Sequence, residues 1–207
     1  MSTRVALIDS GVNRGHPHLR DFGDIVLGPD LGADDSTPGG DHADLLGHGT
    51  AAAAAILDLA PSITLCSIKI FHTRPRSSLE VLLEALRAAA EWEADLVNLS
   101  LGTRDPTWVD PLEEIVDDYR RRGIRLVSPA ASGGLPSFPG FLEGVEGVLP
   151  DPNLPRLAPE RRPWGERLFW YASPYPRSLP GLPRHLNLKG PSMAAANLTG
   201  CLSRLPE

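Results

Sequence analysis

Short, continuous runs of apolar residues alternate with longer segments of helical periodicity along the first 130 residues. The apolar runs are rich in Val, Ile and Leu and show no regular alternation with polar residues. Such runs are typical of strands that are buried on both faces of a sheet. We expect these strands at residues 4–8, 25–27, 65–70, 96–99 and 124–127.

Three helices are predicted between these strands, over residues 49–59, 79–93 and 111–122. The second has an apolar stripe at 3.6-residue spacing from Leu79 to Ala90, and Ser77 or Ser78 can cap it. Strands separated by helices of this length are typical of crossover units in a parallel sheet. The pattern therefore predicts an α/β fold with a mostly parallel central sheet flanked by helices.

The pattern changes after Pro129. Residues 129–191 hold many of the 21 prolines and few long periodic segments, which predicts loops with short strands near 147–149 and 168–172. A last helix is expected to begin near Ser192 and to end before Pro206. The length of 207 residues and the lack of a linker-like segment predict one domain over residues 1–207.

Composition and charge limit the partners and the location. The net charge is -6 with a pI of about 5.5, and no basic face offsets it, so nucleic acid is not an expected partner. No secretory signal precedes the first strand, and no apolar run approaches the ~18 residues of a membrane span. Cys66 and Cys201 lie in apolar contexts that predict buried free thiols. We expect a cytoplasmic protein without membrane contact.

Three short motifs contain candidate chemistry. In "VALIDSGV", Asp9 closes a strand beside a tight turn, although a carboxylate there can also simply cap the turn. In "GHGT", His48 lies between two glycines at the start of an alanine-rich helix, a setting that also suits a structural histidine. In "GPSMAAA", Ser192 opens the last helix, where its hydroxyl and backbone N–H face the same space. Capping alone also explains a serine at this position.

Topology predicts that some of these groups meet. Ligands of open parallel sheets bind outside the carboxyl ends of the strands. Asp9 follows one predicted strand and the string "SLG" at 100–102 follows another, so both should lie at the same edge.

Metal and cofactor sites are not expected. The strings "HPH" and "GGDHADLLGH" have metal-like spacing, but no cluster of Cys or His completes a site. The acidic segment that precedes His48 is expected to be a solvated loop, with a cation site or the recognition of basic substrate residues as alternatives. Its carboxylates are Asp34, Asp35, Asp41 and Asp44.

The three motifs, in this order along the chain, resemble the Asp, His and Ser motifs of the subtilisin-like serine proteases. The strings "DLVNLSLGT" at 95–103 and "GIRLVSPAASGG" at 123–134 are similar to the family's strands beside the substrate cleft. The resemblance covers roughly residues 4–203 and implies the family's three-layer fold.

The resemblance also implies a catalytic triad. Ser192 would attack a peptide carbonyl, His48 would move the proton, and Asp9 would orient His48. The substrate would bind as an extended strand. The residues that would bind it are Ser100, Leu101, Gly102, Pro129, Ala130 and Ala131.

The string "SPAASGG" departs from the family at the oxyanion hole. An asparagine is usual where this chain has Ser132, and a glycine is usual at Ala131. The hole would then consist of the Ser192 backbone N–H and the shorter Ser132 side chain. Loss of one such donor costs ~10²- to 10³-fold in rate. The departure puts the strength of oxyanion binding in question.

We interpret the chain as a serine endopeptidase that forms an acyl-enzyme on Ser192. The sequence offers no segment before the first strand that resembles the inhibitory pro-domain of secreted relatives. From this we expect a narrow-specificity intracellular processing peptidase, whose partner is a peptide or protein substrate such as a precursor peptide. Two alternatives are a peptide-binding pseudo-protease with an impaired oxyanion hole, and a peptide ligase or cyclase.

Overall fold

An eight-stranded sheet forms the centre of the computed structural model, which describes residues 2–19, 22, 24–32 and 42–204. The strand order is β2-β3-β1-β4-β5-β8-β10-β9. The strands are β1 (Arg4–Asp9), β2 (Ile25–Asp30), β3 (Thr64–Lys69), β4 (Leu96–Leu99), β5 (Arg125–Pro129), β8 (Glu146–Pro150), β9 (Glu160–Trp164) and β10 (Arg167–Ala172). The helices are α1 (His48–Leu59), α2 (Leu79–Glu91), α3 (Val109–Arg122) and α4 (Pro191–Leu202). Three short 3-10 helices are η1 (Pro17–Leu19), η2 (Pro106–Trp108) and η3 (Arg184–Leu186).

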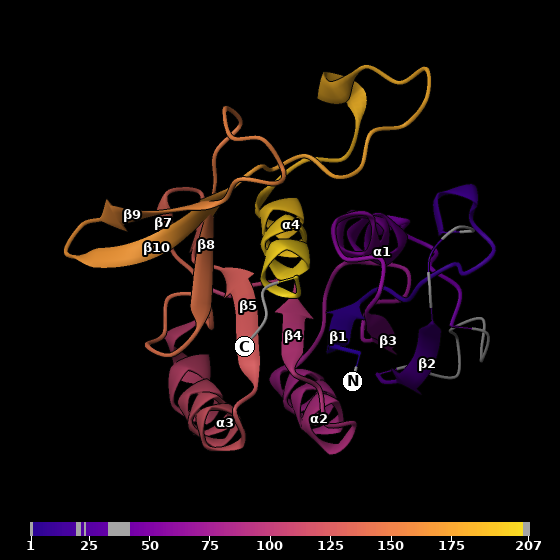
Figure 1. Ribbon diagram of the computed structural model, residues 1–207. Helices are drawn as coiled ribbons and strands as arrows, with labels where there is room; N and C mark the ends of the chain where they lie inside the picture. The colour runs from indigo at the N-terminus through magenta and orange to yellow at the C-terminus, as the bar shows by residue number, and fades with distance from the viewer. Residues whose placement is uncertain (1, 20–21, 23, 33–41, 205–207) are drawn as a thin grey trace.

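The predicted fold class is confirmed. Every pairing from β2 across to β10 is parallel, and each predicted strand and helix has a counterpart within a few residues of its predicted limits. The crossover helices lie on both faces of the sheet (Figure 1). The result is a three-layer arrangement with α1 and α4 on one face and α2 and α3 on the other.

Three strands were not predicted from the sequence. β9 pairs antiparallel with β10 at the sheet edge, and β6 (Ala131–Ser132) pairs with β7 (Leu135–Pro136) in a small hairpin. The β9 string "ERRPW" lacks an apolar pattern because the strand bonds on one side only. Its two arginines instead lie over aromatic rings of β10, Arg161 at 4.7 Å from the Trp170 centroid and Arg162 at 4.1 Å from that of Tyr171.

Alternate residues of β1 enter two separate cores. Val5 and Leu7 pack in the cluster that holds the buried residues of α1 and α4. Ala6 and Ile8 pack in the cluster that holds those of α2 and α3. Because successive strand side chains point to opposite faces, a fully apolar strand serves both cores. This is why β1 is apolar from Val5 to Ile8, between Arg4 at its start and Asp9 at its end.

Close packing of α1 against α4 aligns the two helices that begin with His48 and near Ser192. Gly200 faces the last turns of α1, where an added Cβ would lie 2.8 Å from Leu59 Cβ and 2.9 Å from the Ile56 oxygen. Ile56 follows His48 by eight residues, and Gly200 follows Ser192 by eight residues, so the contact lies equally far along the two helices. Gly49 at the start of α1 lies against Asp9 at the end of β1, and Ser192 at the start of α4 bonds to Ser100 just after β4. Both helices therefore begin at the edge of the sheet where β1 and β4 end.

Gly200→Ala should lower the free energy of unfolding by about 1–3 kcal/mol, because a methyl group does not fit against α1. In a helix without this contact, the same substitution would raise the free energy of unfolding by ~1 kcal/mol, because alanine has a higher helix propensity than glycine. Urea unfolding measures the change. Gly15→Ala is the matched control, because a Cβ at Gly15 meets nothing within 4 Å. Equal or greater stability of Gly200→Ala would contradict this account of the packing.

Candidate active site

Asp9 and His48 form a hydrogen-bonded pair at the carboxyl edge of the sheet. Asp9 is 1% exposed, and its two carboxylate oxygens lie 2.8 and 3.0 Å from His48 Nδ1. The backbone N–H of Ser10 also donates to Asp9 Oδ1, at 2.7 Å. A carboxylate only accepts hydrogen bonds, so the proton resides on Nδ1, and Nε2 is left as a hydrogen-bond acceptor. The His48 side chain is 31% exposed and can meet a ligand.

Two glycines allow α1 to begin beside Asp9. Gly47 has φ 71°, a left-handed conformation that favours glycine. A Cβ at Gly49 would collide with the Gly11 carbonyl oxygen and lie 3.3 Å from Asp9 Cβ. The backbone therefore passes close to its neighbours at "GHG", and this approach brings the imidazole to the carboxylate.

Asp44 is buried, which corrects the expectation of a solvated loop at this residue. It is 6% exposed. One carboxylate oxygen accepts from Ser10 Oγ at 2.7 Å, Leu46 N at 3.1 Å and Gly47 N at 2.8 Å. The other accepts from the backbone N and the Oγ1 of Thr50, at 2.8 and 2.7 Å. Asp44 therefore caps α1 and ties it to the turn after Asp9, a role whose only sequence signal is an acidic residue just before a helix.

The remaining carboxylates of the acidic segment, Asp34, Asp35 and Asp41, lie outside the described residues. Among the residues that the structure describes, no group of three or more His, Cys, Asp or Glu side chains is arranged to hold a metal ion. In the same part of the chain, no helix is long and apolar enough to cross a bilayer. Cys66 and Cys201 are both free thiols.

Burial and two carboxylates act in opposite directions on the His48 imidazole. Burial lowers the pKa of His48, but the hydrogen bond and charge of Asp9, with the charge of Asp44, outweigh it. The net effect raises the pKa above its ordinary value of 6.5. A base at this position therefore becomes neutral at a higher pH than a free histidine does.

Ser192 is the second residue of α4. Gly190 precedes the helix with φ 148°, and Pro191 occupies the first turn, where a missing N–H costs nothing. The first-turn N–H groups, that of Ser192 among them, have no acceptor within the helix. The Ser192 hydroxyl donates to the Ser100 carbonyl oxygen at 2.8 Å. Within the described residues, no hydrogen bond joins this hydroxyl to His48.

The predicted substrate-binding residues lie at the ends of two adjacent strands. Ser100, Leu101 and Gly102 follow β4, and Pro129 to Ser132 end β5 and form β6. Gly102 is exposed, and its backbone lies close to Ser137. A Cβ added at Gly102 would collide with the Ser137 hydroxyl. Ala130 and Ala131 are buried, whereas Ser132 is exposed and opposes Leu135 in the hairpin.

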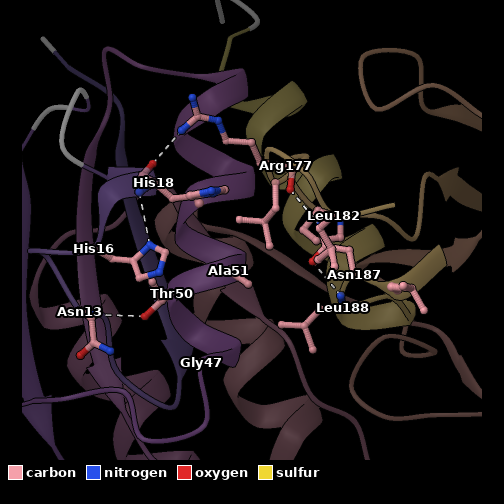
Figure 2. Close-up of a pocket in the computed structure, with 14 residues that line it drawn as sticks. Asn13, His16, His18, Gly47, Thr50, Ala51, Arg177, Leu182, Asn187 and Leu188 are labelled. Atoms are coloured by element: carbon pink, nitrogen blue, oxygen red, sulfur yellow. Dashed lines mark hydrogen bonds between the residues drawn. The ribbon is translucent and has the colours of Figure 1, made fainter. Parts of the chain in front are cut away.

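A pocket that was not predicted from the sequence lies on the α1 side of the site (Figure 2). It is bounded by α1, the η1 region and residues 176–188, with a volume of about 360 Å³. Residues 179–188 carry four leucines in a Pro-rich string without helical or strand periodicity. Those leucines were the available signal, because exposed apolar residues in an irregular segment indicate a binding surface.

A buried carboxylate bonded to a histidine, with a serine at the start of the adjacent helix, is an arrangement suited to a serine hydrolase. Residues 2–134 match the sequence profile of the Subtilase family. The chain belongs to this family, which confirms the predicted resemblance.

Individual relatives are distant. Subtilisin E of Bacillus subtilis (strain 168) is 28% identical over 142 residues, which cover 64% of this chain and 35% of the relative. The nisin leader peptidase NisP of Lactococcus lactis superimposes with a TM-score of 0.72 at 19% identity, over 98% of this chain and 76% of that one. The patellamide maturation protease PatA gives 0.68 at 21% identity, over 97% and 76%. These likenesses establish a shared fold.

We predict that the pKa of His48 lies above 6.5 and that Asp44→Asn lowers it by removing a nearby negative charge. Asp9→Asn should lower the pKa further, because it removes the hydrogen bond to the carboxylate as well. Proton NMR of the imidazole across a pH titration measures these values. Asp110→Asn, an exposed change in α3, should leave the pKa unaltered. A pKa that is the same in Asp44→Asn and wild type would refute the contribution of Asp44.

Proposed function

We propose that this chain is a serine endopeptidase whose triad is Asp9, His48 and Ser192. A single observation carries the proposal. Both oxygens of the buried Asp9 carboxylate lie within hydrogen-bond distance of His48 Nδ1, at the edge of the sheet where α4 begins with Ser192 in its first turn. A histidine held in this tautomer has Nε2 available as a general base. Family membership supports the same chemistry.

The reaction follows from these groups. His48 Nε2 takes the hydroxyl proton as Ser192 Oγ bonds to the peptide carbonyl carbon. The intermediate then collapses, its C–N bond breaks, and the same imidazole delivers the proton to the leaving amine. Water repeats the sequence on the acyl-enzyme. Before attack, the Ser192 hydroxyl must rotate away from the Ser100 carbonyl, which is a change of one side-chain rotamer.

Oxyanion binding is the weaker part of the proposal. The Ser192 N–H in the first turn of α4 supplies one donor. We assign the second donor to Ser132, which is exposed at the end of β6. The substrate would lie as an added strand beside Ser100 to Gly102, with its acyl-side residue toward Ala130 and Ala131.

We propose narrow specificity, with a precursor peptide as the substrate. The names of two structural relatives support this choice, because one is a leader peptidase and the other a maturation protease. We further propose that the chain acts in the cytoplasm. The free thiols of Cys66 and Cys201 favour a reducing compartment.

Wild type should react with a fluorophosphonate probe at Ser192, and Ser192→Ala should abolish the labelling. Hydrolysis of a reactive ester should fall at least about 10³-fold in the same variant, because the attacking group is removed. Gel fluorescence and a spectrophotometric ester assay measure the two effects. Ser203→Ala, a hydroxyl at the end of α4, is the matched control. If wild type labels no better than Ser192→Ala, the endopeptidase proposal fails.

A peptide-binding protein without turnover is the second candidate, and the serine at position 132 favours it. We predict that Ser132→Asn raises kcat on a simple ester or amide by about tenfold or more, since a full donor is worth ~10²- to 10³-fold. Ser132→Ala should lower kcat if the hydroxyl donates. Unchanged rates in both variants would show that the second oxyanion donor is a different group.

A further inference from the structure

The pocket of about 360 Å³ between α1 and residues 176–188 has two contrasting walls (Figure 2). One wall is a face of α1 that begins at Gly47, the residue before His48. The other carries four leucines, Leu179, Leu182, Leu186 and Leu188. Leu182, Leu186 and Leu188 are 36%, 64% and 45% exposed. Their apolar surface faces a cavity large enough for a ligand.

The pocket adjoins the proposed catalytic groups. Gly47 is bonded to His48, and Leu188 lies four residues before Ser192 in the chain. The proposed acyl-side residues follow β4 and β5, strands that α4 covers, whereas α1 lies against the neighbouring β1 (Figure 1). A peptide whose acyl side occupies that region must continue past Ser192 toward α1. The segment that leaves as the amine would therefore run over this pocket.

Two basic residues of the pocket, Arg177 and His18, are paired or uncharged. Arg177 pairs with Asp58 at 3.1 Å, between Nε and Oδ1, and donates to the His18 carbonyl at 2.8 Å. Burial lowers the pKa of His18, and the charges of Arg177 and His16 act in the same direction. His18 is then uncharged at neutral pH. Among the described lining residues there is no carboxylate, so the pocket suits an apolar group.

We propose that this pocket receives a large apolar side chain from the leaving segment of the substrate, so that a leucine-like residue shortly after the scissile bond is preferred. The inference rests on the proposed endopeptidase function. The proposed occupant follows from the position of the pocket beside the catalytic edge, with Gly47 next to His48 in its lining, and from the exposed leucines. Apolar pockets of this kind discriminate by about 10- to 200-fold.

Aminolysis of an acyl-enzyme tests the pocket without knowledge of the natural substrate. A small methyl ester of an N-acyl amino acid acylates Ser192: its C–O bond breaks, and methanol leaves with the proton that His48 took from Ser192. The acyl group then passes to water or to an added amine. In the second case the ester bond to Ser192 breaks and an amide bond forms. The amine proton returns through His48 to Ser192 Oγ. The ratio of amide to acid product reports amine binding on the leaving side, independently of the acylation rate.

The amines are the dipeptide amides Leu-Gly, Gly-Leu and Gly-Gly. We expect at least one leucine-containing amide to give about tenfold more aminolysis than Gly-Gly. We expect two variants to reduce this advantage to about threefold or less. The double variant Leu182→Ser/Leu186→Ser removes the apolar wall, and Ala51→Phe fills the pocket. Leu157→Ser/Leu168→Ser should retain the wild-type ratio, because those leucines are similarly exposed, at 63% and 66%, but do not line the pocket.

The possible failures are distinct. Equal aminolysis by all three amides in wild type would overturn the pocket while leaving the endopeptidase intact. A leucine advantage that survives in both pocket variants would overturn it as well. If wild type forms no acyl-enzyme above the level of Ser192→Ala, the proposed function itself fails.

Discussion

The packing of α1 against α4 is the constraint on which the site depends. His48 and Ser192 are far apart in the chain, and each stands at the beginning of a helix. Small residues on both helices allow a close approach, and the contact of Gly200 with Leu59 and Ile56 sets their relative position. Because protein interiors are densely packed and transmit strain, a shift of one helix would change the position of the imidazole relative to the serine.

A chain of buried hydrogen bonds then fixes the histidine. Asp9 holds Nδ1, and Ser10 connects Asp9 to Asp44: its backbone N–H donates to Asp9 at 2.7 Å, and its hydroxyl donates to Asp44 at 2.7 Å. Asp44 in turn caps the helix on which His48 stands. Two carboxylates near one imidazole favour its protonated form, which is the form that must hand a proton to a leaving group. The same residues thus serve helix formation and the proposed chemistry.

The two sides of Ser192 differ in structure. The proposed acyl side is built from strand ends and a small hairpin, in which Ala130 and Ala131 are buried. The proposed leaving side has a leucine-lined cavity against α1. An enzyme with this cavity would select substrates in part by the residues on the leaving side of the scissile bond. That property fits the proposal of a processing peptidase with narrow specificity.

By itself, the sequence determined the α-helices, the strands of the parallel sheet with their order along the chain, and the three motif positions. Buried parallel strands and amphipathic helices are encoded by local periodicity, and Asp9, His48 and Ser192 each stand at a boundary between such elements. The tertiary structure decided the features that depend on distant contacts. The burial of Asp44 requires Ser10 from another element, and β9 is a strand only because β10 supplies its partners. The direction of the Ser192 hydroxyl and the leucine pocket likewise arise from residues brought together by folding, which no local pattern records.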